Sequence, residues 1–291
     1  QGKNVMLFLL ESIDTWLLTE DYMPNLYRLQ QQSINFENHF SPMFISAGTF
    51  GTEYTVNTGL IPPTNGVSSK AYSSYSFPYS LAHLFENAGY TANSFHSSSP
   101  KIYSRGLIHA NWGYEKYHSF VDMGMEDYQR DSQMMNGYAD MVAPEHYFDF
   151  ILTYSGHGPY TEEMDNICQG HWEDVSRTVD PGTIPAQGAD LDEYRRAVAH
   201  AMETDAFIGQ LVEQMESDGT LDNTVLIFFT DHYCKYMTNT QLVMDLKGAE
   251  NMDMLNRTPF FIYSKGTPAQ TVSKVTSSMD IAPTIANLFD L

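Results

Sequence analysis

The sequence predicts an α/β fold in which a mostly parallel central sheet is sandwiched between layers of helices. Two observations predict it: short β-rich runs recur along the 291 residues, and segments with helical periodicity separate them. No internal repeat and no aromatic-poor, disordered segment interrupts this pattern. We therefore expect residues 1–291 to form a single domain, with room for a small C-terminal subdomain.

The predicted strands are short runs rich in apolar, β-branched and aromatic residues. They are Val5–Leu10, Thr91–Phe95, Tyr147–Leu152, Val225–Thr230 and Phe260–Tyr263. The helical patterns between successive runs are typical of parallel strands joined by crossover helices.

Helices are expected in the segments between these strands. Asp192–Gly219 is the clearest, because its apolar residues share one face and Gly219 can end the helix. These apolar residues are Ile208, Leu211, Val212 and Met215. The other predicted helices are Pro24–Gln32, a segment from Thr49 towards Gly59, Ser80–Gly89 and Asp280–Leu288.

The stretch Gly170–Asp190 lacks periodicity and contains two prolines and several glycines. We interpret it as a long surface loop. Such a loop either borders a substrate groove or is a plain linker.

The charge balance is strongly acidic. Fifteen Lys and Arg residues against 36 Asp and Glu residues give a net charge of −21, which repels nucleic acid and bare anionic membrane at long range and argues against nucleic acid as a partner. A phosphate substrate would then need a small local cluster of cations or a bound metal ion to capture it.

The longest apolar run, Val5–Leu10, is far shorter than the roughly 20 residues that span a bilayer. Because the chain begins at Gln1 without a signal peptide, we expect any membrane or targeting segment to lie upstream. Cys168 and Cys234 fit neither a CxxC motif nor a zinc-binding spacing. Two unpaired thiols are the preferred interpretation, and a disulfide is the alternative.

Carboxylate and imidazole residues follow four of the predicted strands. Glu11 follows the first strand, His96 the second and Asp231-His232 the fourth, while His157 lies just past the third. Each alone is commonly a helix cap or a solvated residue. The carboxyl ends of parallel strands meet at one edge of a sheet, so these residues together predict a divalent-metal site there.

A nucleophile candidate lies in the small-residue turn Ser46-Ala47-Gly48-Thr49, which leads into a predicted helix. The amino end of a helix offers free amide groups to a phosphate, and a nearby metal lowers the pKa of a hydroxyl group. Thr49 is therefore the candidate. The alternative is an N-cap threonine without chemistry.

Several motifs resemble the catalytic domain of lipoteichoic acid synthases and related phosphoglycerol transferases of the alkaline phosphatase superfamily. They occur in that family's order over nearly the whole chain. These motifs are Asn4–Ser12, Gly48–Thr55, Ser155–Tyr160, Thr230–Tyr233, Arg257–Ile262 and Met279–Thr284. The resemblance implies a sulfatase-like fold.

The resemblance also implies roles for individual residues. The implied metal ligands are Glu11, Thr49, Asp231 and His232, around Mn²⁺ or else Mg²⁺ or Zn²⁺, with Thr49 also the nucleophile. The implied substrate-binding residues are His96, Tyr103, Arg105 and His157, with Arg105 holding a phosphate by bidentate hydrogen bonds.

Three positions depart from the family pattern. Tyr103 replaces a tryptophan, Ser98 replaces an aspartate, and Cys234-Lys235-Tyr236 replaces a more polar stretch. These departures leave the identity of the headgroup and of the acceptor open.

The function implied is ping-pong transfer of glycerol phosphate through a covalent intermediate on Thr49. The implied donor is phosphatidylglycerol and the implied acceptor a glycolipid or polymer. The domain is then expected at the extracytoplasmic face of the membrane, either anchored by upstream transmembrane helices or released.

The alternatives on the same scaffold are a phosphodiesterase or phosphatase and a phosphoethanolamine transferase. The apparent single set of metal ligands favours transfer, since two-metal hydrolases of the family resembled usually bring additional Asp and His ligands. Neither cysteine lies in the C/S-x-P-x-R context of a sulfatase. A non-catalytic domain that binds polymer is the alternative from another class.

Overall fold

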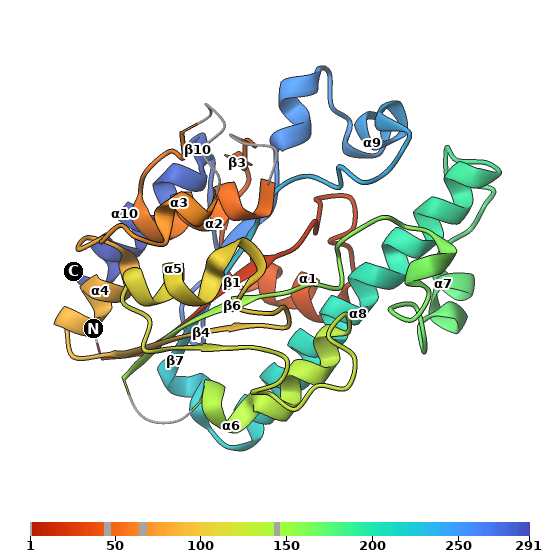
Figure 1. Ribbon diagram of the computed structural model, residues 1–291. Coiled ribbons are helices and arrows are strands. Elements are labelled where there is room, and N and C mark those ends of the chain that lie inside the picture. The colour runs from red at the N-terminus through yellow and green to blue at the C-terminus, as the bar shows by residue number, and fades with distance from the viewer. Residues whose placement is uncertain (1, 44–47, 64–68, 143–145) are drawn as a thin grey trace.

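The computed structural model describes residues 2–43, 48–63, 69–142 and 146–291, in which helices cover both faces of one large sheet (Figure 1). Eight strands form this sheet in the order β5-β4-β6-β1-β7-β8-β2-β9. Ser46 and Ala47 of the predicted turn lie outside the described residues.

The central strands are parallel, as predicted. Val5 in β1 lies opposite Phe148 in β6 and Val225 in β7, with both neighbours parallel to β1. The strands of the large sheet are β1 (Asn4–Leu10), β2 (Ile34–Phe36), β4 (Thr91–His96), β5 (Lys116–His118), β6 (Tyr147–Leu152), β7 (Thr224–Thr230), β8 (Phe260–Ser264) and β9 (Gln270–Val272). β8 runs antiparallel to β7 and to β2. The predicted α/β class is therefore confirmed, and the C-terminal strands β8 and β9 extend the main sheet instead of forming a subdomain.

A second, two-stranded sheet pairs β3 (His39–Phe40) with β10 (Thr276–Ser277). The helices are α1 (Pro24–Gln31), α2 (Gly48–Thr58), α3 (Ser69–Tyr72), α4 (Leu81–Asn87), α5 (Arg105–Asn111), α6 (Tyr138–Met141), α7 (Trp172–Thr178), α8 (Ala189–Ser217), α9 (Thr240–Lys247) and α10 (Ser278–Phe289). Short 3₁₀ helices are η1 (Ile102–Ser104), η2 (Asp131–Gly137), η3 (Glu162–Met164), η4 (Thr220–Asn223) and η5 (Met252–Asn256).

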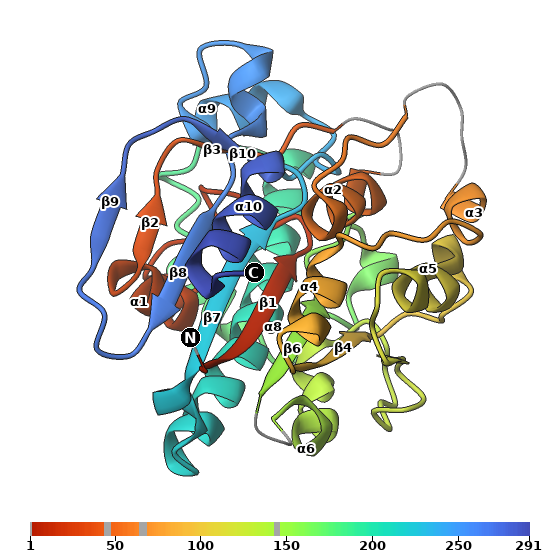
Figure 2. The ribbon, with the colours of Figure 1, turned by 90° about the vertical axis from the view of Figure 1, so that its left-hand side faces the viewer.

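The sheet divides the core into two apolar clusters. Met6 and Phe8 of β1 face the cluster that contains α1 and α8, while Val5 and Leu7 face the one that contains α2, α4 and α10. Accordingly, α8 lies behind the strands and α10 in front of them in Figure 2. Burial on both faces explains why β1 is an unbroken apolar run instead of an alternating one.

The predicted long helix is confirmed as α8, which begins slightly earlier than expected. Ile208 and Met215 are buried as predicted, and the chain leaves the helix at Gly219, whose φ is +80°. A positive φ costs glycine little, which is why this residue can end the helix.

The prediction of an unstructured loop over Gly170–Asp190 is wrong in part. Residues Trp172–Thr178 form α7, which packs on α8 and buries Val175, with Val179 buried just beyond its end. The short helix was missed because glycine- and proline-rich chain flanks it. No residue of this stretch lines the cavity of about 440 Å³ at the carboxyl ends of the parallel strands, so the stretch does not border that groove.

Two further expectations concern cysteines and membrane spans. Cys168 and Cys234 are both buried and unpaired, which confirms the preferred interpretation. Within the described ranges, no helix combines the length and the apolar character that crossing a bilayer requires.

Candidate active site

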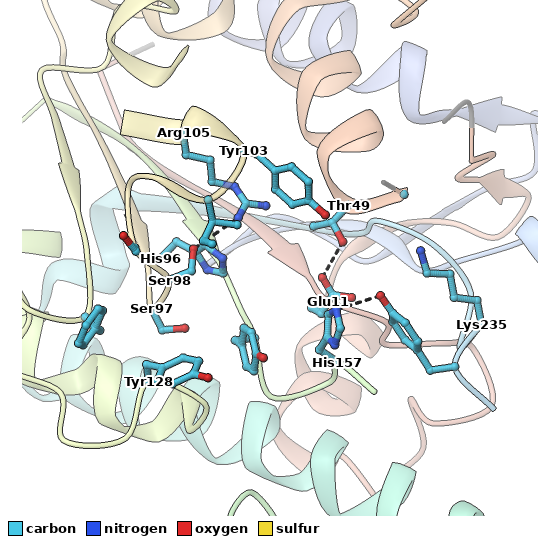
Figure 3. Close-up of a pocket in the computed structure, with 16 residues that line it drawn as sticks. Glu11, Thr49, His96, Ser97, Ser98, Tyr103, Arg105, Tyr128, His157 and Lys235 are labelled. Atoms are coloured by element: carbon cyan, nitrogen blue, oxygen red, sulfur yellow. Dashed lines mark hydrogen bonds between the residues drawn. The ribbon is translucent and has the colours of Figure 1, made fainter. Parts of the chain in front are cut away.

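The carboxyl ends of four parallel strands gather polar side chains at one edge of the sheet, where a cavity of about 440 Å³ lies. Asp231 and His232 are buried beside Glu11 and are not among the residues that line this cavity. Glu11 follows β1, His96 ends β4, His157 lies beyond β6, and Asp231-His232 follow β7. Figure 3 shows the cavity between α2 on one side and the chain around Tyr128 on the other. It is lined by Glu11, Gly48, Thr49, His96, Ser97, Ser98, Ser99, Ile102, Tyr103, Arg105, Phe120, Tyr128, Tyr154, His157, Lys235 and Tyr236.

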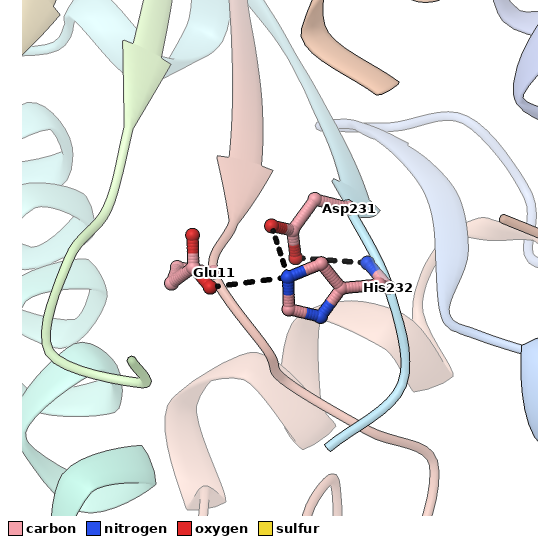
Figure 4. A group of neighbouring side chains, drawn as sticks. All are labelled: Glu11, Asp231 and His232. Atoms are coloured by element: carbon pink, nitrogen blue, oxygen red, sulfur yellow. Dashed lines mark hydrogen bonds and ion pairs between the residues drawn. The ribbon is translucent and has the colours of Figure 1, made fainter. Parts of the chain in front are cut away.

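Glu11, Asp231 and His232 form a buried cluster whose ligand atoms all lie within 4.8 Å of one another (Figure 4). His232 Nε2 is 3.1 Å from Asp231 Oδ2 and 3.5 Å from Glu11 Oε1. Neither Asp231 Oδ2 nor His232 Nε2 has a hydrogen bond in the described structure, despite these short distances. A buried polar atom without a partner is costly, so converging oxygen and nitrogen donors of this kind fit a divalent cation.

Neighbouring groups orient the cluster. His232 Nδ1 donates to the Tyr233 carbonyl at 2.9 Å, which leaves the lone pair of Nε2 facing the carboxylates. Asp231 Oδ1 accepts from the backbone amides of Ser12 and His232, each at 2.9 Å. These contacts keep Asp231 Oδ2 and His232 Nε2 aimed at one point.

The protonation of the cluster also favours a cation. Burial, and then the negative charge of Glu11, raise the pKa of Asp231 to about 7. A divalent ion would favour the ionised carboxylate and release that proton.

Thr49 lies in the first turn of α2, and its Oγ1 donates to Glu11 Oε2 at 2.9 Å. Thr52 Oγ1, one turn further, donates to the Asp231 carbonyl at 2.7 Å and ties α2 to the end of β7. A Cβ at Gly48 would lie 2.7 Å from the His232 ring. Glycine at this position therefore allows the amino end of α2 to approach the cluster.

Arg105 is anchored by a residue that the motifs did not single out. Glu53 accepts from Arg105 Nε at 3.1 and 3.0 Å, Arg105 Nη2 is 3.0 Å from the same carboxylate, and His109 Nε2 is 2.6 Å from it. All three side chains are buried. One edge of the guanidinium is thus occupied, and the Nη1 side, 3.4 Å from Ser98 Oγ, remains for an anion in the cavity.

The two cavity histidines are neutral near pH 7. His96 Nδ1 donates to the Leu152 carbonyl at 3.0 Å, and burial followed by the charge of Arg105 lowers its pKa to about 3. Burial also lowers the pKa of His157, whose Nε2 is 2.9 Å from the Tyr236 hydroxyl. Both rings can exchange hydrogen bonds with a bound ligand without adding charge.

Lys235 is a cavity residue that sequence reasoning noted only as a departure from the family. A Cβ on Gly48 would lie 2.9 Å from Lys235 Nζ, so the ammonium group lies beside the first turn of α2. Its nitrogen is 5.1 Å from the centre of the Tyr236 ring, and no acidic side chain pairs with it among the described residues. Its position three residues after the Asp-His pair was the available signal.

Aromatic rings form one wall of the cavity. Tyr236 and His157 have ring centres 4.5 Å apart, His157 and Tyr154 5.6 Å, and Tyr154 and Tyr128 5.6 Å. Tyr103 stacks on Phe50 of α2 and lies under the Arg105 guanidinium. Aromatic walls with few polar groups are typical of small-molecule sites.

The chain is similar to known proteins over nearly its whole length. The family model described as Sulfatase matches residues 3–291. Lipoteichoic acid synthase 2 of Bacillus subtilis (strain 168) is 22% identical over 313 residues, covering 99% of this chain and 45% of its own length. The chain therefore spans less than half the length of this curated relative.

Solved structures show the same fold. The lipoteichoic acid synthase LtaP from Listeria monocytogenes matches with a TM-score of 0.81 and 21% identity, covering 100% of this chain and 72% of that one. The phosphoglycerol transferase GacH from Streptococcus pyogenes, in complex with sn-glycerol-1-phosphate, matches with a TM-score of 0.68 and 17% identity, covering 98% and 74%. The resemblance indicated by the motifs is thereby confirmed.

Proposed function

The chain belongs to the sulfatase family, and on that premise we propose that it transfers phosphoglycerol from phosphatidylglycerol to a hydroxyl of a glycolipid or polymer. The observation that carries this proposal is the Thr49 hydroxyl, 2.9 Å from Glu11 and beside the buried Asp231 and His232. The names of the similar proteins, lipoteichoic acid synthase and phosphoglycerol transferase, support the choice of group.

In this proposal Glu11, Thr49, Asp231 and His232 hold one divalent ion, for which Mn²⁺ is our choice and Mg²⁺ and Zn²⁺ are also suitable. When bound, the ion would supply charge for the phosphoryl oxygens and lower the pKa of the threonine hydroxyl. The donor set of two carboxylates, one imidazole and one hydroxyl suits a hard or borderline cation.

Thr49 is the proposed nucleophile. Its hydroxyl already donates to Glu11 Oε2, so that carboxylate holds the proton which must leave as Oγ1 attacks phosphorus. The bond from Thr49 Oγ1 to phosphorus forms as the bond to diacylglycerol breaks, and the diacylglycerol oxygen takes the proton held by Glu11 as it leaves. An acceptor hydroxyl then attacks the same phosphorus, the bond from phosphorus to Thr49 Oγ1 breaks, and the proton of the acceptor passes through Glu11 to Thr49.

Three positive features surround the proposed position of the phosphoryl group. The amino end of α2 at Gly48 and Thr49, the side chain of Lys235 and that of Arg105 all line the cavity, and a helix amino end carries a partial positive charge. Such fixed positive groups stabilise the charge that develops on the phosphoryl oxygens during transfer. The neutral rings of His96 and His157, with Tyr103, orient the glycerol headgroup.

Among the residues that the structure describes, the two cysteines offer no sulfatase-type nucleophile to this cavity. Neither Cys168 nor Cys234 lines it, and Thr49 occupies the place beside the metal-ligand cluster. Burial also raises the pKa of Cys234, to well above the neutral range.

We propose that the domain works at the extracytoplasmic face of a membrane, where its lipid donor lies.

The test is the release of diacylglycerol from phosphatidylglycerol with Mn²⁺ present. Thr49→Ala should lower the turnover rate by about 10⁴-fold, because the nucleophile is gone, while the melting temperature is kept. Thr58→Ala, at the far end of the same helix, is the matched control and should turn over at the parent rate. Equal rates for the parent and Thr49→Ala would refute the proposed nucleophile.

A further inference from the structure

Acidic residues are distributed very unevenly along the chain. Only two of the 36, Glu53 and Glu86, fall between residues 38 and 114, although the whole chain carries a net charge of −21. Glu53 is buried against Arg105, and Glu86 lies 3.1 Å from His83. The surface built by this stretch therefore carries very little free negative charge.

The same stretch exposes many apolar side chains. It supplies eight of the sixteen exposed large apolar residues in the described ranges: Met43, Leu60, Ile61, Tyr75, Tyr79, Ile102, Tyr103 and Leu107. Tyr79 is 82% exposed and Leu107 63% exposed. Clusters of this kind on one side of a protein mark interaction sites, whereas single exposed apolar residues are common.

These side chains form a surface that reaches the catalytic cavity. Leu60, Tyr75 and Tyr79 line a groove whose floor includes Tyr72. Tyr72 lies 6.0 Å from Phe50, and Phe50 stacks 5.6 Å from Tyr103 at the cavity. Helix α3 contacts η1, and Figure 2 shows α3 next to α5 at one side of the molecule.

Two lysines complete this surface. Lys70 in α3 and Lys101 before η1 are both exposed, and neither has an acidic partner among the described residues. Lysine stems can lie along apolar surface while their charged ends reach the phosphates of lipid headgroups. Tyrosines prefer the interface between water and hydrocarbon because one end of the ring system is polar.

We propose that this surface docks the protein onto an anionic lipid bilayer. The docking face is defined as Leu60, Lys70, Tyr75, Tyr79, Lys101, Ile102 and Tyr103. An anionic bilayer repels most of a chain that carries −21 charges, so the approach must use the part that lacks free carboxylates and presents lysines. The proposal rests on the proposed function, since a lipid donor has to reach the cavity beside Ile102 and Tyr103.

Co-sedimentation with vesicles of phosphatidylglycerol and phosphatidylcholine tests the docking face, using residues outside the catalytic cavity. Replacing both Lys70 and Lys101 by Glu should weaken vesicle binding by at least about 30-fold. Each lysine near an anionic surface raises the affinity by up to about tenfold, and a glutamate in its place is repelled by that surface. The triple variant Leu60→Ser, Tyr75→Ser, Tyr79→Ser should weaken binding by at least about tenfold. The matched control changes Met252, Val275 and Leu288, three exposed apolar residues outside the stretch, to Ser and should bind as the parent does.

Turnover of two forms of the lipid separates this inference from the proposed function. The triple variant should lose turnover of vesicle lipid but keep the parent rate on short-chain phosphatidylglycerol dispersed as monomers. Loss of turnover on both forms, or vesicle binding equal to the parent, would overturn the docking face. Self-association of the parent that the triple variant abolishes would also overturn it and assign the face to a second copy. If the parent binds vesicles through this face but releases no diacylglycerol from vesicle or monomeric lipid, the proposed function is refuted and the docking face is retained.

Discussion

Asp231 Oδ2 and His232 Nε2 are two buried atoms without hydrogen-bond partners in the described structure, and both lie close to the Glu11 carboxylate. The other polar atom of each side chain, Asp231 Oδ1 and His232 Nδ1, is hydrogen-bonded to backbone groups. Turning either side chain away would therefore break existing hydrogen bonds. A cation that Glu11 shares with them removes the cost of burying them unpaired. The site is therefore expected to be more stable with metal than without it.

Metal binding should raise the melting temperature, because an ion that binds only the folded state stabilises it by mass action. With Mn²⁺ at about a thousand times its dissociation constant, the gain is about 4 kcal/mol, which corresponds to several degrees for a chain of this size. Asp231→Ala should remove most of this shift, whereas Asp253→Ala, an exposed carboxylate in η5, should keep it. Differential scanning calorimetry with and without a chelator measures both, and an identical shift in Asp231→Ala would contradict the ligand assignment.

Lys235 supplies charge beside Thr49 without an acidic partner in the described chain. Lys235→Met should lower kcat/KM for phosphatidylglycerol about 10²-fold, because one fixed positive group is lost from the developing phosphoryl charge. Lys235→Arg should recover part of the loss, and Lys101→Met should leave turnover of monomeric lipid unchanged. Calorimetric titration with Mn²⁺ should give the parent affinity for Lys235→Met. A parent-like kcat/KM in this variant would remove the residue from the site.

At the scale of elements, the five longer predicted strands share one property. Each lies in the interior of the sheet, and in β1, β6, β7 and β8 burial on both faces leaves a mainly apolar run. β2, β5 and β9 span three residues each, too few for a periodic pattern to appear, and they pair at or near the sheet edges. Their formation depends on neighbours that are distant in sequence.

The site also contains both residues that the sequence predicts and residues that it does not. Glu11, His96 and Asp231-His232 were predictable because they directly follow recognisable strands. The Glu53–Arg105 pair was not, because it joins α2 to α5 and no local pattern connects two helices more than fifty residues apart. Long-range pairs of this kind appear only once the topology brings the elements together.

Glu53 should be essential for holding α5 against α2. Glu53→Gln would leave the buried Arg105 charge without its partner and should lower the free energy of unfolding by about 3 kcal/mol. Glu86→Gln, which affects only an exposed pair with His83, should change it by less than about 0.5 kcal/mol. Urea unfolding measures both variants, and equal stabilities would show that the buried pair contributes no more than the surface pair.

His39 makes the small β3–β10 sheet sensitive to acid. Its Nδ1 is 3.1 Å from Thr276 Oγ1, and burial lowers its pKa to about 3 against an ordinary value of 6.5. The unfolded chain binds the proton more readily, so the stabilisation is complete above pH 6.5 and is lost as the pH falls towards 3. At pH 5 the cost is about 2 kcal/mol.

Urea unfolding at pH 7 and pH 5 tests this linkage. The parent should lose about 2 kcal/mol more between the two pH values than His39→Gln, which cannot be protonated in this range. Other buried groups titrate equally in both proteins and cancel in the comparison. If the two proteins lose the same free energy, His39 is not the source of the acid sensitivity.

At the scale of the whole molecule, the carboxyl edge of the sheet and the stretch from residue 38 to 114 have different roles. The carboxyl edge gathers the polar residues of the cavity, as ligand sites in open parallel sheets do. The stretch from residue 38 to 114 provides both the Thr49 helix and the docking face, while 34 of the 36 acidic residues lie elsewhere. An acidic molecule can in this way present a nearly acid-free face to a negatively charged membrane.

The central claim is that Thr49 carries the transferred group between donor and acceptor. Mass spectrometry of the intact protein, quenched after mixing with Mn²⁺ and phosphatidylglycerol in the absence of acceptor, tests it most directly. The account predicts added mass equal to one glycerol phosphate group, mapped by peptide sequencing to Thr49 and absent in Thr49→Ala. Diacylglycerol release at the parent rate with no adduct at any time point, or an adduct on another residue, would contradict it.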